Sequence, residues 1–132
     1  MTALVVAKFG GTSVADFDAM NRSADVVLSD ASVRVVVLSA SAGVTNLLVA
    51  LAEGLEPAER QAKLEAIRAI QYAVLERLAN PAVIRDEIER LLENLGTLAE
   101  AASLATSTAL TDELVSHGEL MSTLLFVEIL RE

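Results

Sequence analysis

Two short runs of apolar residues stand near the start of the chain, and each is followed by small residues. The first, residues 4–9, is closed by Gly10 and Gly11, and the second, residues 33–38, is rich in β-branched side chains and is closed by Ser-Ala-Ser-Ala-Gly. Both patterns predict buried strands. Between them, apolar residues recur at helical spacing over residues 16–29. The order strand, helix, strand predicts a parallel βαβ unit with a right-handed connection.

The rest of the chain has a helical pattern. A short helix is predicted over residues 45–53, followed by a break over residues 54–57. The next helix is marked by a stripe of apolar residues three or four apart: Leu64, Ile67, Ile70, Val74 and Leu78. A second stripe marks another long helix: Ile84, Ile88, Leu91, Leu95, Leu98 and Ala102. Such stripes indicate helices that bury one face.

Polar residues predict where the later helices begin and end. Asn80 and Pro81 place a cap and a first-turn proline at the start of the second long helix. Residues 106–111 form a polar break, and residues 112–131 are helical again, without a Gly, Asn or Pro stop signal. Two parallel strands are also too few to cover these helices. We therefore expect residues 1–132 to be one truncated portion of a larger α/β domain.

Composition narrows the classes of protein that this pattern allows. Hydrophobic residues make up 53% of the 132 residues and aromatic residues only 3%, which predicts a core of Ala, Val, Ile and Leu. The net charge of -9 repels phosphate backbones and anionic lipids, so nucleic-acid and membrane partners are not expected. The chain contains no cysteine, which excludes disulfides, thiolate metal sites and cysteine nucleophiles. It has neither a signal peptide nor an apolar run of about 18 residues, and we expect a cytoplasmic protein.

The first candidate for chemistry is the end of the first strand. Lys8 interrupts an apolar run just before Gly10 and Gly11, and an ammonium there faces a desolvation penalty unless an anion meets it. The glycines let the backbone approach a ligand, and Thr12 and Ser13 stand just before a helix whose amides favour phosphate. The segment indicates a phosphate-binding loop, although it is neither a Walker A sequence nor a dinucleotide fingerprint. The alternative is a strand-end lysine that extends into water before an ordinary glycine turn.

The second candidate is the loop after the second strand, residues 39–46. Its small residues leave room for a ligand. The hydroxyls of residues such as Ser39 and Thr45 stand at the carboxyl end of a strand, where open α/β sheets bind substrates. The alternative is that Thr45 only caps the following helix.

The third candidate is Glu119, in the last predicted helix. Small polar residues lie three and four positions away on the same face: Ser116, Ser122 and Thr123. A carboxylate there suits a substrate ammonium, and Gly118 beside it allows close approach. The alternative is a solvated glutamate on an exposed stripe. The single histidine, His117, is assigned no role.

Three motifs in this order are specific in combination. KFGGTSV at residues 8–14, SASAGVTN at 39–46 and SHGE at 116–119 resemble the aspartate kinases of the amino-acid kinase family, and the resemblance extends over the whole chain. It implies a three-layer αβα catalytic domain, of which residues 1–132 are the N-terminal portion without the regulatory ACT domains. The activity implied is transfer of the ATP γ-phosphoryl group to the β-carboxylate of L-aspartate, the first step of lysine, threonine and methionine biosynthesis.

The resemblance also assigns residues to the two substrates. The residues expected to bind the ATP phosphates are Lys8, Gly10, Gly11 and Ser13. Those expected to bind aspartate are Ser39, Thr45 and Glu119. Lys8 is expected to neutralise the transferring phosphoryl group and Glu119 to hold the α-ammonium of aspartate. No metal ligand is assigned, because Mg²⁺ is expected to arrive with ATP, and the full-length protein is expected to be a homo-oligomer.

Two other functions fit part of the pattern. Another amino-acid kinase, such as a glutamate or acetylglutamate kinase, shares the lysine and the glycine-rich loop in this family. Glu119 together with Thr45 argues against an N-acetylated substrate, which has no free ammonium for a carboxylate to bind. The alternative from another class is a non-enzymatic helical module that dimerises through exposed apolar helix faces.

Overall fold

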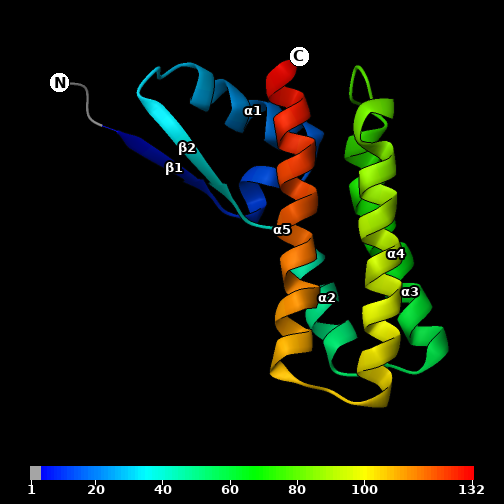
Figure 1. Ribbon diagram of the computed structural model, residues 1–132. Coiled ribbons are helices and arrows are strands. Elements are labelled where there is room, and N and C mark those ends of the chain that lie inside the picture. The colour runs from blue at the N-terminus through cyan, green and yellow to red at the C-terminus, as the bar shows by residue number, and fades with distance from the viewer. Residues whose placement is uncertain (1–3) are drawn as a thin grey trace.

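The computed structural model describes residues 4–132 as two parallel strands beside a bundle of helices (Figure 1). In chain order the elements are β1 Val5–Phe9, a 3-10 helix η1 Gly11–Val14, α1 Phe17–Leu28, β2 Val33–Leu38, α2 Val44–Ala52, α3 Pro57–Leu75, α4 Ala82–Leu104 and α5 Thr108–Arg131. The two strands pair in parallel and α1 connects them, so the predicted start of the fold, strand, helix, parallel strand, is confirmed. The helix-rich remainder is confirmed as well.

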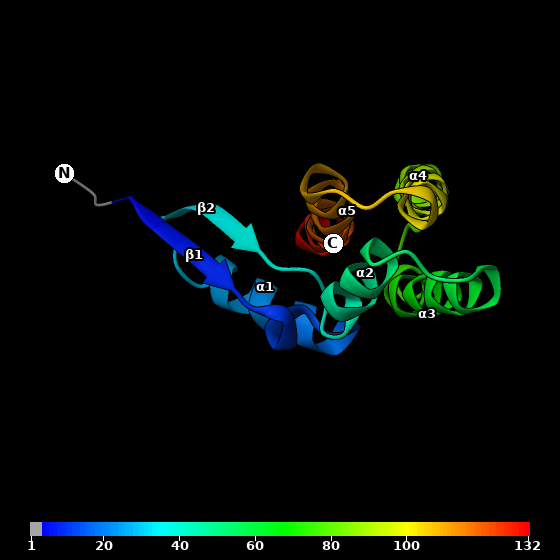
Figure 2. The same cartoon turned by 90° about the horizontal axis from the view of Figure 1, so that it is seen from below.

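The two-stranded sheet is covered on one face only. Its residues that are buried or half-buried are Val5, Ala7, Phe9, Val33, Val36 and Leu38. The exposed residues of the two strands are Val6, Lys8, Arg34, Val35 and Val37. Figure 2 shows α1 lying along the sheet while the opposite side of the strands is open. The prediction of two buried strands is therefore wrong for the outer face, whose residues stay exposed within residues 4–132 although α5 borders it at the end of β2.

Helix α5 organises the core, because it contacts α1, α2, α3, α4 and β2. Its apolar side packs into a cluster whose largest fully buried side chains are Phe126, Met20, Leu48, Leu51, Ile67, Leu75, Ile88, Leu95, Leu114, Met121 and Leu125. Phe126 is the one aromatic ring among them, and it lies 6.1 Å from the ring of Phe9 on β1. The core is thus mostly aliphatic, as the composition predicts. No helix within residues 4–132 combines the length and the apolar character needed to cross a bilayer.

Two helix starts differ from the predictions. Pro81 occupies the N-cap position of α4 rather than its first turn, so Asn80 lies outside the helix. Helix α5 begins at Thr108, because the hydroxyl of Ser107 accepts a hydrogen bond from the amide of Leu110 at 3.1 Å and caps it. The predicted polar break over residues 106–111 is therefore too long, since its polar residues after Ser107 form the exposed first turn of α5.

Candidate functional site

The loops that follow β1 and β2 lie side by side at the carboxyl ends of the two strands. The amide of Ser39 donates to the carbonyl of Phe9 at 3.1 Å, and the amide of Ala42 donates to the carbonyl of Gly11 at 3.2 Å. A Cβ at residue 11 would lie only 3.2 Å from the carbonyl oxygen of Ala40, so glycine permits this close approach. The predicted phosphate loop and the predicted substrate loop therefore form one continuous surface.

Helix α5 crosses the second of these loops at Gly118. A Cβ at residue 118 would lie 2.8 Å from the Cβ of Ala40, so the helix and the loop touch here. One turn later, the buried hydroxyl of Ser122 donates to the carbonyl of Ser39 at 2.7 Å. These two contacts hold the turn of α5 that carries Glu119 against the start of the substrate loop, and the Glu119 side chain faces the end of β2.

Glu119 lines an open depression of about 440 Å³ between the end of β2 and α5. The other residues of this depression are Val36, Val37, Leu38, Ser116, Leu120 and Thr123. Within residues 4–132, the ion pairs formed do not include the Glu119 carboxylate. The side chain is thus available to a cationic ligand, and its exposure fits both the binding interpretation and the solvated one.

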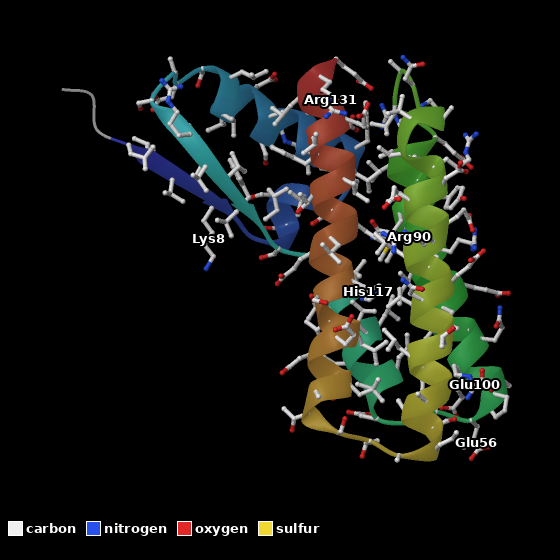
Figure 3. The ribbon with its side chains drawn as sticks, viewed as in Figure 1. Lys8, Glu56, Arg90, Glu100, His117 and Arg131 are labelled. Carbon is white, nitrogen blue, oxygen red and sulfur yellow. The ribbon has the colours of Figure 1, made fainter. Side chains whose placement is uncertain are left out.

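Lys8 extends from the open face of the sheet into solvent (Figure 3). The expected desolvation of its ammonium is wrong for residues 4–132, because the outer face of β1 is not covered in this chain. Its register partner is Val37, which also lines the depression beside Glu119. Lys8, from the first motif, is thus paired with Val37, and Glu119, from the third motif, lines the same depression as Val37.

The helix expected to favour phosphate through its N-terminal amides is α1, and two features of its start bear on that expectation. Thr12 and Ser13 lie inside η1, and α1 starts only after Asp16, whose carboxylate accepts a hydrogen bond from the amide of Ala19 at 2.8 Å. The Asp16 carboxylate occupies one of the N-terminal amides and repels a second anion, so it disfavours phosphate at the start of α1. Gly10 still borders open space, because a Cβ there would meet nothing within 4 Å.

Thr45 does not cap α2. The N-cap residue is Gly43, whose φ of 88° lies in the left-handed region that favours glycine. Thr45 is the second residue of the helix and is exposed. The alternative that Thr45 serves only as a cap is therefore wrong, and its side chain stands at the edge of the substrate loop.

His117 is buried on the inner side of α5 (Figure 3). Its Nδ1 lies 2.8 Å from the carbonyl oxygen of Glu113, one turn earlier, so the ring is held by its own helix. Among residues 4–132, its Nε2 has no hydrogen-bond partner. The ring is part of the core, and we assign it no catalytic role.

Two buried serines contact the loops in a way that the sequence did not reveal: Ser23 was not named, and Ser122 was expected only as a polar neighbour of Glu119. Ser23 on α1 donates to the carbonyl of Ser13 at 2.7 Å, in the same way that Ser122 on α5 donates to the carbonyl of Ser39. A sequence signal exists for Ser23 alone, because it is the one polar residue among the buried residues of α1, whereas the buried face of α5 also carries His117 and Glu128.

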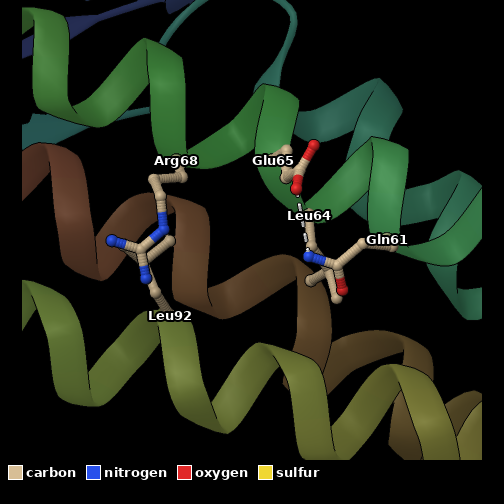
Figure 4. Close-up of a pocket in the computed structure, with 5 residues that line it drawn as sticks. All are labelled: Gln61, Leu64, Glu65, Arg68 and Leu92. Carbon is tan, nitrogen blue, oxygen red and sulfur yellow. Dashed lines mark hydrogen bonds between the residues drawn. The ribbon is translucent and has the colours of Figure 1, made fainter.

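A separate pocket of about 150 Å³ lies between α3 and α4 (Figure 4). Its residues are Gln61, Leu64, Glu65, Arg68 and Leu92. None of the three motifs contributes to it, so it is not the candidate site. Within residues 4–132, no three His, Cys, Asp or Glu side chains are grouped so that they could hold a metal ion.

Comparison with known sequences relates these motifs to one family. The model of the amino acid kinase family matches residues 3–132. The chain is 82% identical over 132 residues to lysine-sensitive aspartokinase 3 of Escherichia coli strain K12, a match that covers all of this chain and 29% of that protein. It is 34% identical over 132 residues to the chloroplastic aspartokinase 1 of Arabidopsis thaliana, covering 95% of this chain and 23% of that protein. The chain thus spans less than a third of the length of these relatives.

Comparison with solved structures gives the same result. Two structures of E. coli aspartokinase III match with a TM-score of 0.96, one in complex with lysine and aspartate (T-state) at 83% identity and one in complex with aspartate and ADP (R-state) at 82% identity. They cover 97% and 98% of this chain and 29% of each relative. An aspartate kinase of Clostridium acetobutylicum matches with a TM-score of 0.71 at 22% identity, which shows a likeness of fold alone. The expected fold, the N-terminal part of the aspartokinase fold, is confirmed, and the chain belongs to the amino acid kinase family.

Proposed function

We propose that residues 1–132 are the N-terminal portion of the catalytic domain of an aspartate kinase. The enzyme transfers the γ-phosphoryl group of ATP to the β-carboxylate of L-aspartate and produces 4-phospho-L-aspartate. The observation that carries this proposal is the convergence of the three motifs, since the two loops share backbone hydrogen bonds and Ser122 ties the helix of Glu119 to Ser39. The 82% identity to lysine-sensitive aspartokinase 3 supports it.

The loop after β1 is proposed to bind ATP. Its residues in this role are Lys8, Gly10, Gly11 and Ser13. The exposed ammonium of Lys8 is free to neutralise charge on the transferring phosphoryl group, and Gly10 leaves open space for the phosphates. A relative with bound ADP supports a nucleotide ligand. Mg²⁺ enters as part of the Mg-ATP substrate.

The loop after β2 and the middle of α5 are proposed to bind aspartate. Ser39 and Thr45 supply polar groups from the loop and from the first turn of α2, and Glu119 supplies a carboxylate for the α-ammonium. The aspartate bound in both solved structures of E. coli aspartokinase III supports this choice of substrate. The chain covers 29% of that relative, and we propose that residues beyond this chain complete both sites.

The mechanism follows from the charges of the two substrates. The β-carboxylate of aspartate is already an anion at neutral pH, so the reaction needs no general base to create the nucleophile. The main obstacle is repulsion between this carboxylate and the triphosphate, and catalysis consists of positioning the two groups and neutralising their charge. Lys8 and the backbone amides of the loops are the groups of this chain that perform these tasks. The product is an acyl phosphate.

A chimera tests the proposal directly. In this chimera, residues 1–132 of this chain replace the matching segment of E. coli lysine-sensitive aspartokinase 3. We expect it to form an acyl phosphate, trapped with hydroxylamine, from Mg-ATP and aspartate but not from glutamate or N-acetylglutamate. The 132-residue chain by itself should give no product. A folded chimera that prefers glutamate, or that phosphorylates no amino acid, would overturn the assignment.

Two broader expectations remain part of the proposal. The full-length protein is proposed to form a homo-oligomer, which light scattering of the chimera can test. A cytoplasmic location fits an enzyme that consumes ATP and a free amino acid, and it can be tested by fractionating cells that express the full-length protein.

A further inference from the structure

Each of the two candidate loops is fixed by one buried serine from a helix that packs against it. Ser23 of α1 donates to the carbonyl of Ser13 and Ser122 of α5 donates to the carbonyl of Ser39, both at 2.7 Å. We propose that Ser23 and Ser122 are positioning residues, and that Ser23 sets the geometry for ATP while Ser122 sets the geometry for aspartate. This inference rests on the proposed function and adds residues that do not themselves touch either substrate.

In each loop, the helix serine holds the carbonyl of a residue whose amide is already hydrogen-bonded. Ser39 donates its amide to the carbonyl of Phe9 at 3.1 Å, and Ser122 holds its carbonyl. Ser13 donates its amide to the carbonyl of Gly10 at 3.0 Å, and Ser23 holds its carbonyl. Both backbone groups of each loop residue are therefore bonded. The residues fixed in this way, Ser13 and Ser39, are themselves proposed ligands.

Burial makes these two bonds effective. Ser122 is 0% exposed, so water cannot replace its hydroxyl without entering the core, and Ser23 is 6% exposed at the edge of an open depression. The carbonyls of Ser13 and Ser39 belong to half-buried residues, and a partly desolvated carbonyl that loses its donor is relieved when its loop moves towards solvent. Removing either hydroxyl should therefore shift or loosen the loop that it holds.

Ser122 also links Glu119 and Ser39, the two residues that are both proposed to bind aspartate. It lies one turn after Glu119 on α5, and its hydroxyl is 3.1 Å from the carbonyl of Glu119 in addition to its shorter bond to Ser39. The spacing between the Glu119 carboxylate and the Ser39 loop, which together are proposed to bracket aspartate, is thus set at Ser122. The hydroxyl of Ser122 makes no contact with the ATP loop in the described part of the chain.

Ser23 acts on the other loop through α1. It lines a depression of about 280 Å³ together with Thr12, Ser13 and Arg22, next to the proposed phosphate-binding residues. Its hydroxyl bonds only to Ser13 within residues 4–132. If the two serines position the loops, each substitution should affect the binding of one substrate only. A role in core packing alone would give no such separation between the two substrates.

The test compares Ser23→Ala and Ser122→Ala in the chimera. Ser122→Ala should raise the KM for aspartate about threefold to tenfold and leave the KM for Mg-ATP within about twofold, and Ser23→Ala should do the reverse. The control is Ser29→Ala, because Ser29 is exposed and its hydroxyl, within residues 4–132, bonds only to the carbonyl of Val26 in α1, so neither KM should change. Equal changes in both constants, or no change in either, would contradict the inference.

Amide hydrogen exchange gives a second result that does not depend on turnover. Ser122→Ala should speed exchange at Ser39 and Ala42 about threefold or more without affecting Ser13, and Ser23→Ala should affect Ser13 alone. Unchanged exchange at these amides would overturn the positioning role even in an active enzyme. Conversely, a chimera that binds neither substrate but shows the two separate exchange effects would contradict the proposed function and leave the positioning of the loops established.

Discussion

Gly118 on α5 lies against Ala40 in the loop after β2, so close that a Cβ at residue 118 would come within 2.8 Å of the Ala40 Cβ. The same Cβ would lie 3.0 Å from Cδ1 of Leu48 on α2. Three elements that carry the candidate aspartate site therefore meet at a residue without a side chain. The close approach depends on that absence, because the interior of a protein has little spare volume.

The first prediction concerns this contact. Gly118→Ala should destabilise the chain by about 1–3 kcal/mol, because overpacking outweighs the better helix propensity of alanine. Gly96 provides a matched control, since it also lies inside a helix but a Cβ there would meet nothing within 4 Å. Gly96→Ala should stabilise the chain by up to about 1 kcal/mol. Urea unfolding of both variants measures the difference, and stabilisation by Gly118→Ala would show that α5 and the loop are not in contact.

The second prediction concerns the contact between α3 and α4. Glu89 on α4 accepts hydrogen bonds from the guanidinium of Arg68, at 2.5 and 3.0 Å, and from the hydroxyl of Tyr72. The hydrogen bonds from Arg68, followed by the one from Tyr72, lower the pKa of Glu89 from 4.5 to about 2. Arg68 also lies over the ring of Tyr72, 5.3 Å from its centroid. The cluster joins the two helices through one carboxylate.

The direction of the pH effect follows from this lowered pKa. The folded state holds the Glu89 proton less tightly than the unfolded state, so the cluster stabilises the fold fully above pH 4.5 and loses that effect as the pH falls towards 2. Because these side chains are partly exposed, the contribution should be about 1 kcal/mol. Glu89→Gln should flatten the dependence of the unfolding free energy on pH over this interval. Glu93→Gln, at an exposed position of α4, should not.

The parts of the fold that were predicted from sequence are those that depend on local patterns. The apolar runs over residues 4–9 and 33–38 gave both strands, and the helical spacing between them gave α1. The convergence of the first two motifs was also predictable, because the carboxyl ends of neighbouring parallel strands meet at one edge. The loop after β2 is accordingly hydrogen-bonded to the segment after β1, through the amide of Ser39 to the carbonyl of Phe9 and the amide of Ala42 to the carbonyl of Gly11.

The parts that were not predicted depend on contacts between distant residues. The apolar side chains of Val6 and Val35 predict that the strands are buried, but the sequence does not show which element covers each face. Both side chains are exposed within residues 4–132. The start of α5 was misplaced because the polar first turn of a helix resembles a loop in composition. The loop contacts of Ser23 and Ser122 were not identified, because a buried hydroxyl is recognised by its partner, which lies 10 and 83 residues away respectively.

The third prediction concerns Lys8. Lys8→Met in the chimera should lower kcat about a hundredfold, because a cation fixed at the transferring phosphoryl group contributes about 3 kcal/mol to transition-state stabilisation. Its folding should change little, because Lys8 is exposed. The only other lysine, Lys63 on α3, gives the matched control, and Lys63→Met should retain normal kcat. A Lys8→Met variant with near-normal kcat would show that this lysine does not act on the phosphates.

The last prediction concerns Glu119, for which exposure leaves two interpretations. If the carboxylate binds the α-ammonium of aspartate, Glu119→Gln removes a charge-assisted hydrogen bond worth about 1.5–3 kcal/mol, and the KM for aspartate should rise about 10-fold to 150-fold. The KM for Mg-ATP should barely change. If Glu119 is only a solvated residue, the substitution should alter binding and stability by less than about 0.5 kcal/mol.

The matched control is Glu113→Gln, because Glu113 is an exposed glutamate of the same helix and lies outside the depression that Glu119 lines. Both variants remove one negative charge from α5, so a change caused by the overall field of the helix should be the same in both. Only a rise in the aspartate KM that is confined to Glu119→Gln supports binding of the ammonium. Equal rises for both substrates, or equal effects of the two variants, would remove Glu119 from the aspartate site.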